Sequence, residues 1–379
     1  MQKNFSLAHC QDSFDKPEKH KIKKLAVFTV SIAFAVGLLI FSRSPAQNIR
    51  NSLTLCYTTV IPSVFPFMVI SAFLINTGVY RVLGKLLSRP IRWLFGCSES
   101  SVCSVILGFL CGYPIGASSA AALYDRGEIS KSEFERLLTF VNNPGAAFVV
   151  GGIGAGLFNS AEIGKTLYIS VILSAIICGV STRIFYSHSE ALPRKSSDDS
   201  SISVSGSLTL ALSESAINML NVCACVLFFS VPVGIIKDLI DPLSFPPLAG
   251  ALLSSFFEIS GGVSATSLLT PPLVALMVCA FACSWSGLSV HLQVFSVCRG
   301  RNISFAPYLL SKLLQGLLSP ILTFIYLRFL SKDSQLSFAP TQSAVTTHPT
   351  AQKICLVIFI ISLIIILIRK ALKVRNLPT

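Results

Sequence analysis

Charged residues are scarce in this chain. Aspartate, glutamate, lysine and arginine together make up 12% of the 379 residues, about half the share that a soluble globular domain carries. Apolar runs long enough to cross about 30 Å of hydrocarbon, roughly 20 helical residues each, recur along the whole length. The composition therefore excludes an ordinary soluble protein and predicts an all-α polytopic membrane protein.

The familiar catalytic and metal-binding motifs are also missing. The chain has no GxSxG, HExxH or P-loop pattern, and no CxxC pair. Most of its twelve cysteines lie inside apolar runs, which is typical of small packing residues rather than of disulfides. Cys279 and Cys283 are one helical turn apart, but no histidine or carboxylate stands at ligand spacing beside them. We therefore expect no enzyme activity, no cofactor and no metal site.

Basic residues outnumber acidic ones, with 30 lysines and arginines against 17 aspartates and glutamates, a net charge of +13. A nucleic-acid-binding protein would gather them on one polar face, but here they form short clusters beside the apolar runs. Such clusters orient membrane segments, because basic loops stay in the cytoplasm. The expected partner is the lipid bilayer and not nucleic acid. The N-terminus is placed in the cytoplasm by Lys16, Lys19, Lys21, Lys23 and Lys24.

The order of apolar and polar stretches predicts ten membrane segments and two linkers rich in serine and threonine. The segments are expected at about 25–41, 52–78, 101–123, 137–158, 165–186, 208–236, 247–270, 272–298, 305–330 and 353–368. The divisions are a basic cytoplasmic N-terminus (1–24), a first transmembrane helix (25–41), a first repeat (50–186), a linker (187–207), a second repeat (208–330), a linker (331–352) and a last transmembrane helix with a basic cytoplasmic tail (353–379).

The two repeats show the same order of features. In the first, a proline-broken span leads to GFLCGYPIGASS, then to FVNNPGAAFVVGGIGAG and a plain apolar helix. In the second, NVCACVLFFSVPVGII leads to FFEISGGVSATS, then to FACSWSGLSVHLQV and another plain helix. Many transporter folds are built from such duplicated units. We therefore interpret the chain as two copies of one four-segment unit.

The basic loops distinguish two topologies for segments 101–123 and 247–270. If both segments cross fully, the loops with Arg126 and Arg194 fall outside, against the positive-inside rule. If each segment enters and returns as a hairpin, every basic cluster lies inside and the repeats are inverted. Glycine and proline suit a hairpin tip, and such backbone survives at membrane depth where protein or water covers it. Eight full spans with two re-entrant hairpins are therefore favoured over ten full spans.

Polar residues inside the apolar segments form the candidate substrate site. Broken helices leave free N–H and C=O groups, and amides add further donors and acceptors. This inventory predicts a midplane site for a neutral or zwitterionic polar solute. The candidates are Gly112, Tyr113, Pro114, Ser118, Asn142, Asn143, Glu258, Gly261, Gly262, Ser264, Ser286, His291 and Gln293.

Each candidate also has a purely structural interpretation. Glycine and serine often let membrane helices approach closely. Adjacent amides such as Asn142 and Asn143 need partners in a dry medium, which favours site lining over packing. Glu258 is an acid well inside an apolar run, where charge is costly, which favours a function unless the helix ends at water. For His291, a hydrogen bond to a neighbouring helix explains the residue at least as well as titration does.

Several motifs resemble one known family. LGFLCGYPIGA, LYDRGEISKSEFERLLTFVNNPGAAFVVGGIG, FEISGG and WSGLSVHLQV are similar to the YlbJ family of sporulation integral membrane proteins, within the nucleoside-recognition or Gate domain group. The resemblance covers roughly 50–330. One departure is Trp285 with Ser286, where the resemblance leads us to expect phenylalanine and glycine. The matched motif positions are Gly112, Tyr113, Pro114, Gly116, Asn142, Asn143, Pro144, Gly261, Ser286, Gly287, His291 and Gln293.

The resemblance implies a protein of the bacterial cytoplasmic membrane that is needed for formation of the spore cortex. The Gate group implies a transport-like architecture without naming a solute. We therefore expect a transporter-like or flippase-like protein for a polar solute. The alternative is a non-transporting membrane scaffold that binds envelope-synthesis proteins, and a homo-oligomer is left open.

Overall fold

The computed structural model describes residues 15–41, 43–185, 204–240 and 246–330. Every regular element in these ranges is a helix, as the composition predicted. The last transmembrane helix (353–379), the linker at 331–352 and most of the linker at 187–207 lie outside the described residues. The elements are α1 (Asp15–Ile40), α2 (Arg43–Leu55), η2 (Cys56–Val60), α3 (Ile61–Asn76), α4 (Tyr80–Phe95), α5 (Val102–Leu110), α6 (Ile115–Asp125), α7 (Lys131–Val141), η3 (Ala147–Leu157), α8 (Ala161–Phe185), α9 (Val204–Ile240), α10 (Pro247–Phe257), α11 (Ile259–Thr266), α12 (Pro272–Trp285), α13 (Gly287–Val297), α14 (Ala306–Ile325) and η5 (Tyr326–Leu330).

Long apolar helices make up the outer part of the bundle. Their surfaces carry large apolar side chains, such as Leu39 of α1, which is 82% exposed, a pattern that fits contact with lipid rather than water. Within the described residues, five stretches are long and apolar enough to cross a membrane: Ser44–Asn76, Ala161–Ile184, Val204–Ile236, Pro272–Val297 and Ala306–Phe329. They coincide with five of the ten expected segments.

Two of the expected segments are pairs of short helices rather than single spans. At 1.5 Å per residue, the 11 residues of α6 or α10 reach only about 16 Å, roughly half of a hydrocarbon core. The partners fold back on each other: a Cβ added at Gly116 of α6 would lie 3.0 Å from the Cα of Gly108 in α5. A Cβ at Gly262 of α11 would lie 2.4 Å from the Cα of Ser255 in α10. We call α5 with α6 the first hairpin and α10 with α11 the second hairpin.

Each hairpin tip packs against a break in the helix that follows it. The first tip meets the break between α7 and η3, where a Cβ on Gly112 would lie 2.3 Å from the backbone nitrogen of Gly145. The second tip meets the break between α12 and α13, where a Cβ on Gly287 would lie 3.1 Å from the Cα of Glu258. Both halves of the chain therefore use the same pairing of a tip with a broken helix.

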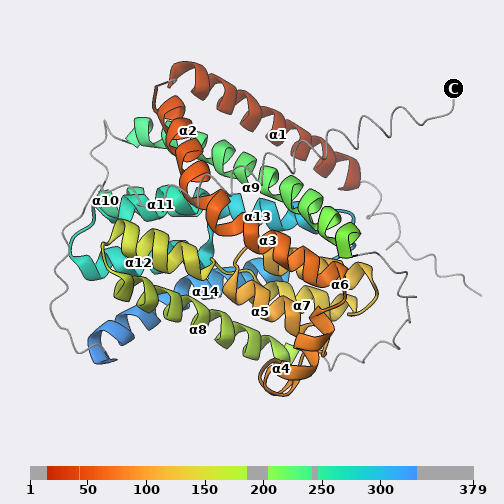
Figure 1. Cartoon of the computed structure of the whole chain (residues 1–379). Helices are drawn as coiled ribbons and strands as arrows, with labels where there is room; N and C mark the ends of the chain where they lie inside the picture. The colour runs from red at the N-terminus through yellow and green to blue at the C-terminus, as the bar shows by residue number, and fades with distance from the viewer. Residues whose placement is uncertain (1–14, 42, 186–203, 241–245, 331–379) are drawn as a thin grey trace, which may run out of the picture.

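The hairpins enter the bundle from opposite ends. In Figure 1 the second hairpin lies at the left end and the first hairpin at the right end, beside α7. Helices α2 and α3 run along α9, while α12, α14 and α8 pack together on the other side. The two tips are thus directed toward the middle of the bundle.

Polar contacts fix the loops around the first hairpin. The Glu128 carboxylate accepts hydrogen bonds from Tyr80 Oη (2.6 Å), Arg81 Nη2 (2.8 Å) and Ser100 Oγ (2.8 Å). Burial opposes ionisation of Glu128, but these donors outweigh it and hold its pKa below the ordinary value of 4.5. The next helix, α7, begins with a capping interaction in which Ser130 Oγ accepts from the backbone N–H of Glu133. The base of the first hairpin is therefore anchored to α4 and α7.

Candidate functional site

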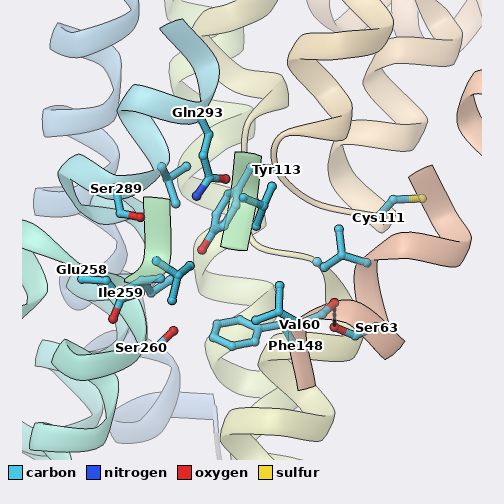
Figure 2. A pocket seen from close by; sticks show the side chains of 15 residues that line it. Val60, Ser63, Cys111, Tyr113, Phe148, Glu258, Ile259, Ser260, Ser289 and Gln293 are labelled. Atoms are coloured by element: carbon cyan, nitrogen blue, oxygen red, sulfur yellow. Dashed lines mark hydrogen bonds between the residues drawn. The ribbon is translucent and has the colours of Figure 1, made fainter. Parts of the chain in front are cut away.

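A small cavity lies where the two hairpin tips approach each other. Its volume is about 50 Å³, which is room for a few water molecules. Tyr113 reaches it from the first tip, and the second tip contributes Glu258 and Ser260 (Figure 2). Helix α13 adds Ser289 and Gln293, and apolar side chains of η2, α3 and α9 form much of the remaining wall. The cavity therefore joins elements from both halves of the chain.

Four polar atoms of this lining are buried without a hydrogen-bond partner among the described residues. They are Tyr113 Oη, Glu258 Oε1, Ser289 Oγ and Gln293 Oε1. A buried polar group without a partner costs about 1–3 kcal/mol, so four in one small space are unusual for a cavity that serves packing alone. They fit a site whose donors and acceptors are completed by a polar ligand or by water.

Glu258 stands at the tip of the second hairpin because the helix breaks there. Its extended backbone (φ −148°, ψ 130°) separates α10 from α11. Its Oε2 accepts a hydrogen bond of 2.7 Å from the backbone N–H of Gly261 and so caps α11. The side chain is 2% exposed, so the carboxylate lies inside the protein rather than at a water-exposed helix end.

Asn142 and Asn143 lie at the end of α7, where the last carbonyls of the helix need donors. Asn142 Nδ2 donates to Leu138 O (3.3 Å) and Asn143 Nδ2 to Phe140 O (2.7 Å). Asn143 O accepts from the backbone N–H of Tyr113 at 2.8 Å. Neither asparagine lines the small cavity. Their side-chain amides cap α7, and the backbone carbonyl of Asn143 holds the first tip. Both Oδ1 atoms are buried without a partner among the described residues.

The other candidates fall into three groups. Gly112 and Pro114 shape the first tip. In the second tip, the Gly261 N–H donates to Glu258, and Gly262 packs closely against Ser255. His291 is buried, and its Nδ1 lies 2.8 Å from Tyr308 Oη of α14, which is the hydrogen bond to a neighbouring helix that the structural interpretation required. The remaining three lie apart from the small cavity: exposed Ser264 on α11, Ser286 in the α12–α13 break, and Ser118 on a second cavity.

This second cavity is larger and more polar. It measures about 370 Å³ and lies between α3, α6, α9 and α13. It lies next to the small cavity along two helices. On α9, Asn221 of the larger cavity directly precedes Val222 of the small one, and on α13 Ser296 of the larger cavity lies three residues after Gln293 of the small one. Asp125 and Arg301, which form an ion pair, lie on its wall. We call it the vestibule.

Ser286 and Gly287 give a matched pair of substitutions. Both have φ of +74°, a backbone conformation that costs a residue with a side chain roughly 1 kcal/mol or more. Ser286→Gly is therefore expected to leave the free energy of unfolding unchanged or raise it by up to about 1 kcal/mol. Gly287→Ala is expected to lower it by at least about 1 kcal/mol, because its Cβ would also press on Glu258. Thermal unfolding in detergent measures both, and a clear loss of stability in Ser286→Gly contradicts the prediction.

Three residues at or near the site are not among the candidates expected from the sequence. Ser260 and Ser289 line the small cavity, and they could have been found as neighbours of Glu258 and His291 in the two motifs. Lys312 lies fully buried in α14, a helix that was interpreted as plain. Lys312 could have been recognised from the sequence, because it is the one charged residue in Ala306–Ile325.

Comparisons with known proteins agree with this architecture. Residues 57–188 match the family described as Gate: Nucleoside recognition. The chain is 25% identical over 338 residues to the sporulation integral membrane protein YlbJ of Bacillus subtilis (strain 168), covering 80% of this chain and 83% of that protein. No solved structure matches the chain. Together with the long apolar helices, these matches support a multi-pass integral membrane protein that is similar to YlbJ and whose residues 57–188 match the Gate family.

Proposed function

We propose that the chain is a transporter-like or flippase-like protein of the bacterial cytoplasmic membrane, with a midplane site for a polar solute at the small cavity. Its role would be in sporulation, in formation of the spore cortex. The name of the Bacillus subtilis relative supports the link to sporulation, and the family resemblance supports the link to the cortex. The cavity supports a solute that offers both hydrogen-bond donors and acceptors.

The observation that carries this proposal is the convergence of unpaired polar atoms from both halves on one space. Tyr113 comes from the first tip, Glu258 from the second, and Gln293 from a broken helix. In transporters, discontinuous helices at the midplane bind the substrate, and access alternates as one unit moves against the other. At about 50 Å³ the cavity holds no organic solute, so we assign this conformation to a closed state.

The proposed topology has two inverted repeats, eight full spans and two re-entrant hairpins, with both chain ends in the cytoplasm. The short hairpin helices support it, and so does their entry from opposite ends of the bundle (Figure 1). In this topology the end that carries Asp125 and Arg301 faces the cytoplasm. The vestibule would then be the cytoplasmic approach, and its 370 Å³ lies in the range of pockets that bind small organic ligands.

A comparison of cavity and surface variants tests the proposal. Tyr113→Phe removes one unpaired hydroxyl and Gln293→Leu one unpaired amide, and both keep the packing volume. We expect each to reduce heat-resistant spores strongly in a strain that lacks its own copy of the gene, because the solute loses a partner. Lys131→Ala, at a residue exposed on the surface of α7, is the control and should complement fully.

The scaffold alternative predicts the reverse. A scaffold would tolerate changes in a sealed cavity and lose activity when exposed loop residues are changed. Full complementation by both cavity variants, with normal protein levels in the membrane, would therefore overturn the transport proposal.

A further inference from the structure

Lys312 is a buried cation without an acidic partner. Its side chain is 0% exposed, and it lies in a helix that is long and apolar enough to cross a membrane. No carboxylate forms a salt bridge with it among the described residues. Ionisable residues in such positions are expensive and usually functional. The hydrogen-bond acceptors around its ammonium group must therefore explain why a lysine is buried at this position.

Those acceptors are oxygens at the break between α7 and η3. Lys312 Nζ donates to the backbone carbonyl of Asn142 at 2.8 Å and to Gln315 Oε1 at 3.3 Å. Gln315 is held in turn, because its Nε2 donates to Thr139 O at 2.7 Å. A positive charge is favourable at the carboxyl end of a helix, where the last carbonyls carry partial negative charge. The ammonium thus lies where a bound cation would find oxygen ligands.

The same break holds the first hairpin tip. Asn143, directly after the carbonyl that Lys312 binds, accepts from the backbone N–H of Tyr113. Tyr113 then lines the small cavity. The carbonyl that Lys312 contacts and the carbonyl that holds the tip therefore belong to successive residues.

We propose that the Lys312 ammonium, which is tethered to α14, takes the place of a dissociable monovalent cation at the α7–η3 break. Its three N–H donors suit an all-oxygen site. Because the charge is tethered to α14, the break keeps its cation whatever the ionic composition of the medium. This inference rests on the proposed function in one respect only, which is that the first hairpin tip takes part in solute access.

Thermal unfolding of the purified full-length chain in detergent tests this without a substrate. The wild-type protein should unfold at the same temperature in sodium chloride and in choline chloride. Lys312→Met keeps most of the volume but removes the charge, and it should lower the unfolding temperature by about 5 °C or more. Sodium should restore part of the loss and choline should not. Lys165→Met is the matched control, since Lys165 is exposed and pairs with Glu162 on the surface of α8.

A second variant gives an independent readout. Lys312→Ala leaves a space with the shape of n-propylammonium, so that ion should raise its unfolding temperature while tetramethylammonium should not. The proposal is overturned if Lys312→Met is as stable as the wild type, if sodium stabilises the wild type as much as the variant, or if no cation restores either variant. If the cavity variants complement fully in the sporulation assay, these unfolding results are unaffected. Each proposal can therefore be overturned without the other.

Discussion

Replacing Glu258 by glutamine is expected to abolish heat-resistant spore formation while the protein remains in the membrane. The glutamine side chain can still accept the hydrogen bond from the Gly261 N–H, so the cap of α11 is kept. What is lost is the ionisable carboxyl group whose Oε1 lies unpaired at the cavity. A carboxylate buried at this depth is costly to keep, which is why we assign it to function rather than to stability.

Two further variants separate charge from structure at this position. Glu258→Ala removes both the charge and the cap, so it should also lower the free energy of unfolding by about 1 kcal/mol. Glu162→Gln changes an exposed acid of α8 whose side chain is 80% exposed, and it should have no effect on spores. The measurement is the count of heat-resistant spores, with immunoblots of the membrane fraction. Normal spore counts with Glu258→Gln would refute a functional charge at the second tip.

Gly116→Ala is expected to be a strongly destabilising single-methyl substitution in the first hairpin. The added Cβ would lie 2.2 Å from the carbonyl oxygen of Val141 and 3.0 Å from the Cα of Gly108. Both atoms belong to the backbone, so no side chain can turn aside, and α6 must move away from α5 and α7. We expect a loss of about 3 kcal/mol or more in the free energy of unfolding.

The second hairpin offers a matched control for this substitution. Gly250 of α10 has no neighbouring atom within 4 Å of an added Cβ, so Gly250→Ala should stabilise the helix by up to about 1 kcal/mol. Thermal unfolding in detergent and protein levels in the membrane measure both variants. If Gly116→Ala proves as stable as Gly250→Ala, the close packing between the first hairpin and α7 is refuted.

The sequence predicted features that depend on local composition. Long apolar runs predicted the spanning helices. Glycine and proline predicted the break at 111–114, because glycine permits unusual backbone angles and proline cannot continue a helix. The motifs also led to the family, which the comparisons confirmed. Asn142 and Asn143 were expected to line the solute site, but the structure places their amide nitrogens on the carbonyls of α7. The free carbonyls at a helix end bind an amide just as a ligand does, and composition does not distinguish these two roles of an asparagine.

By itself, then, the sequence determined that this chain is an all-α membrane protein, because hydrophobicity is a local property. Only the tertiary structure decided which polar groups share one space. Tyr113 and Glu258 are separated by 145 positions, and α13 and α14 must pack beside them before a cavity forms and before Lys312 reaches the carbonyl of Asn142. Contacts between distant segments depend on how helices pack, and no local pattern encodes that arrangement.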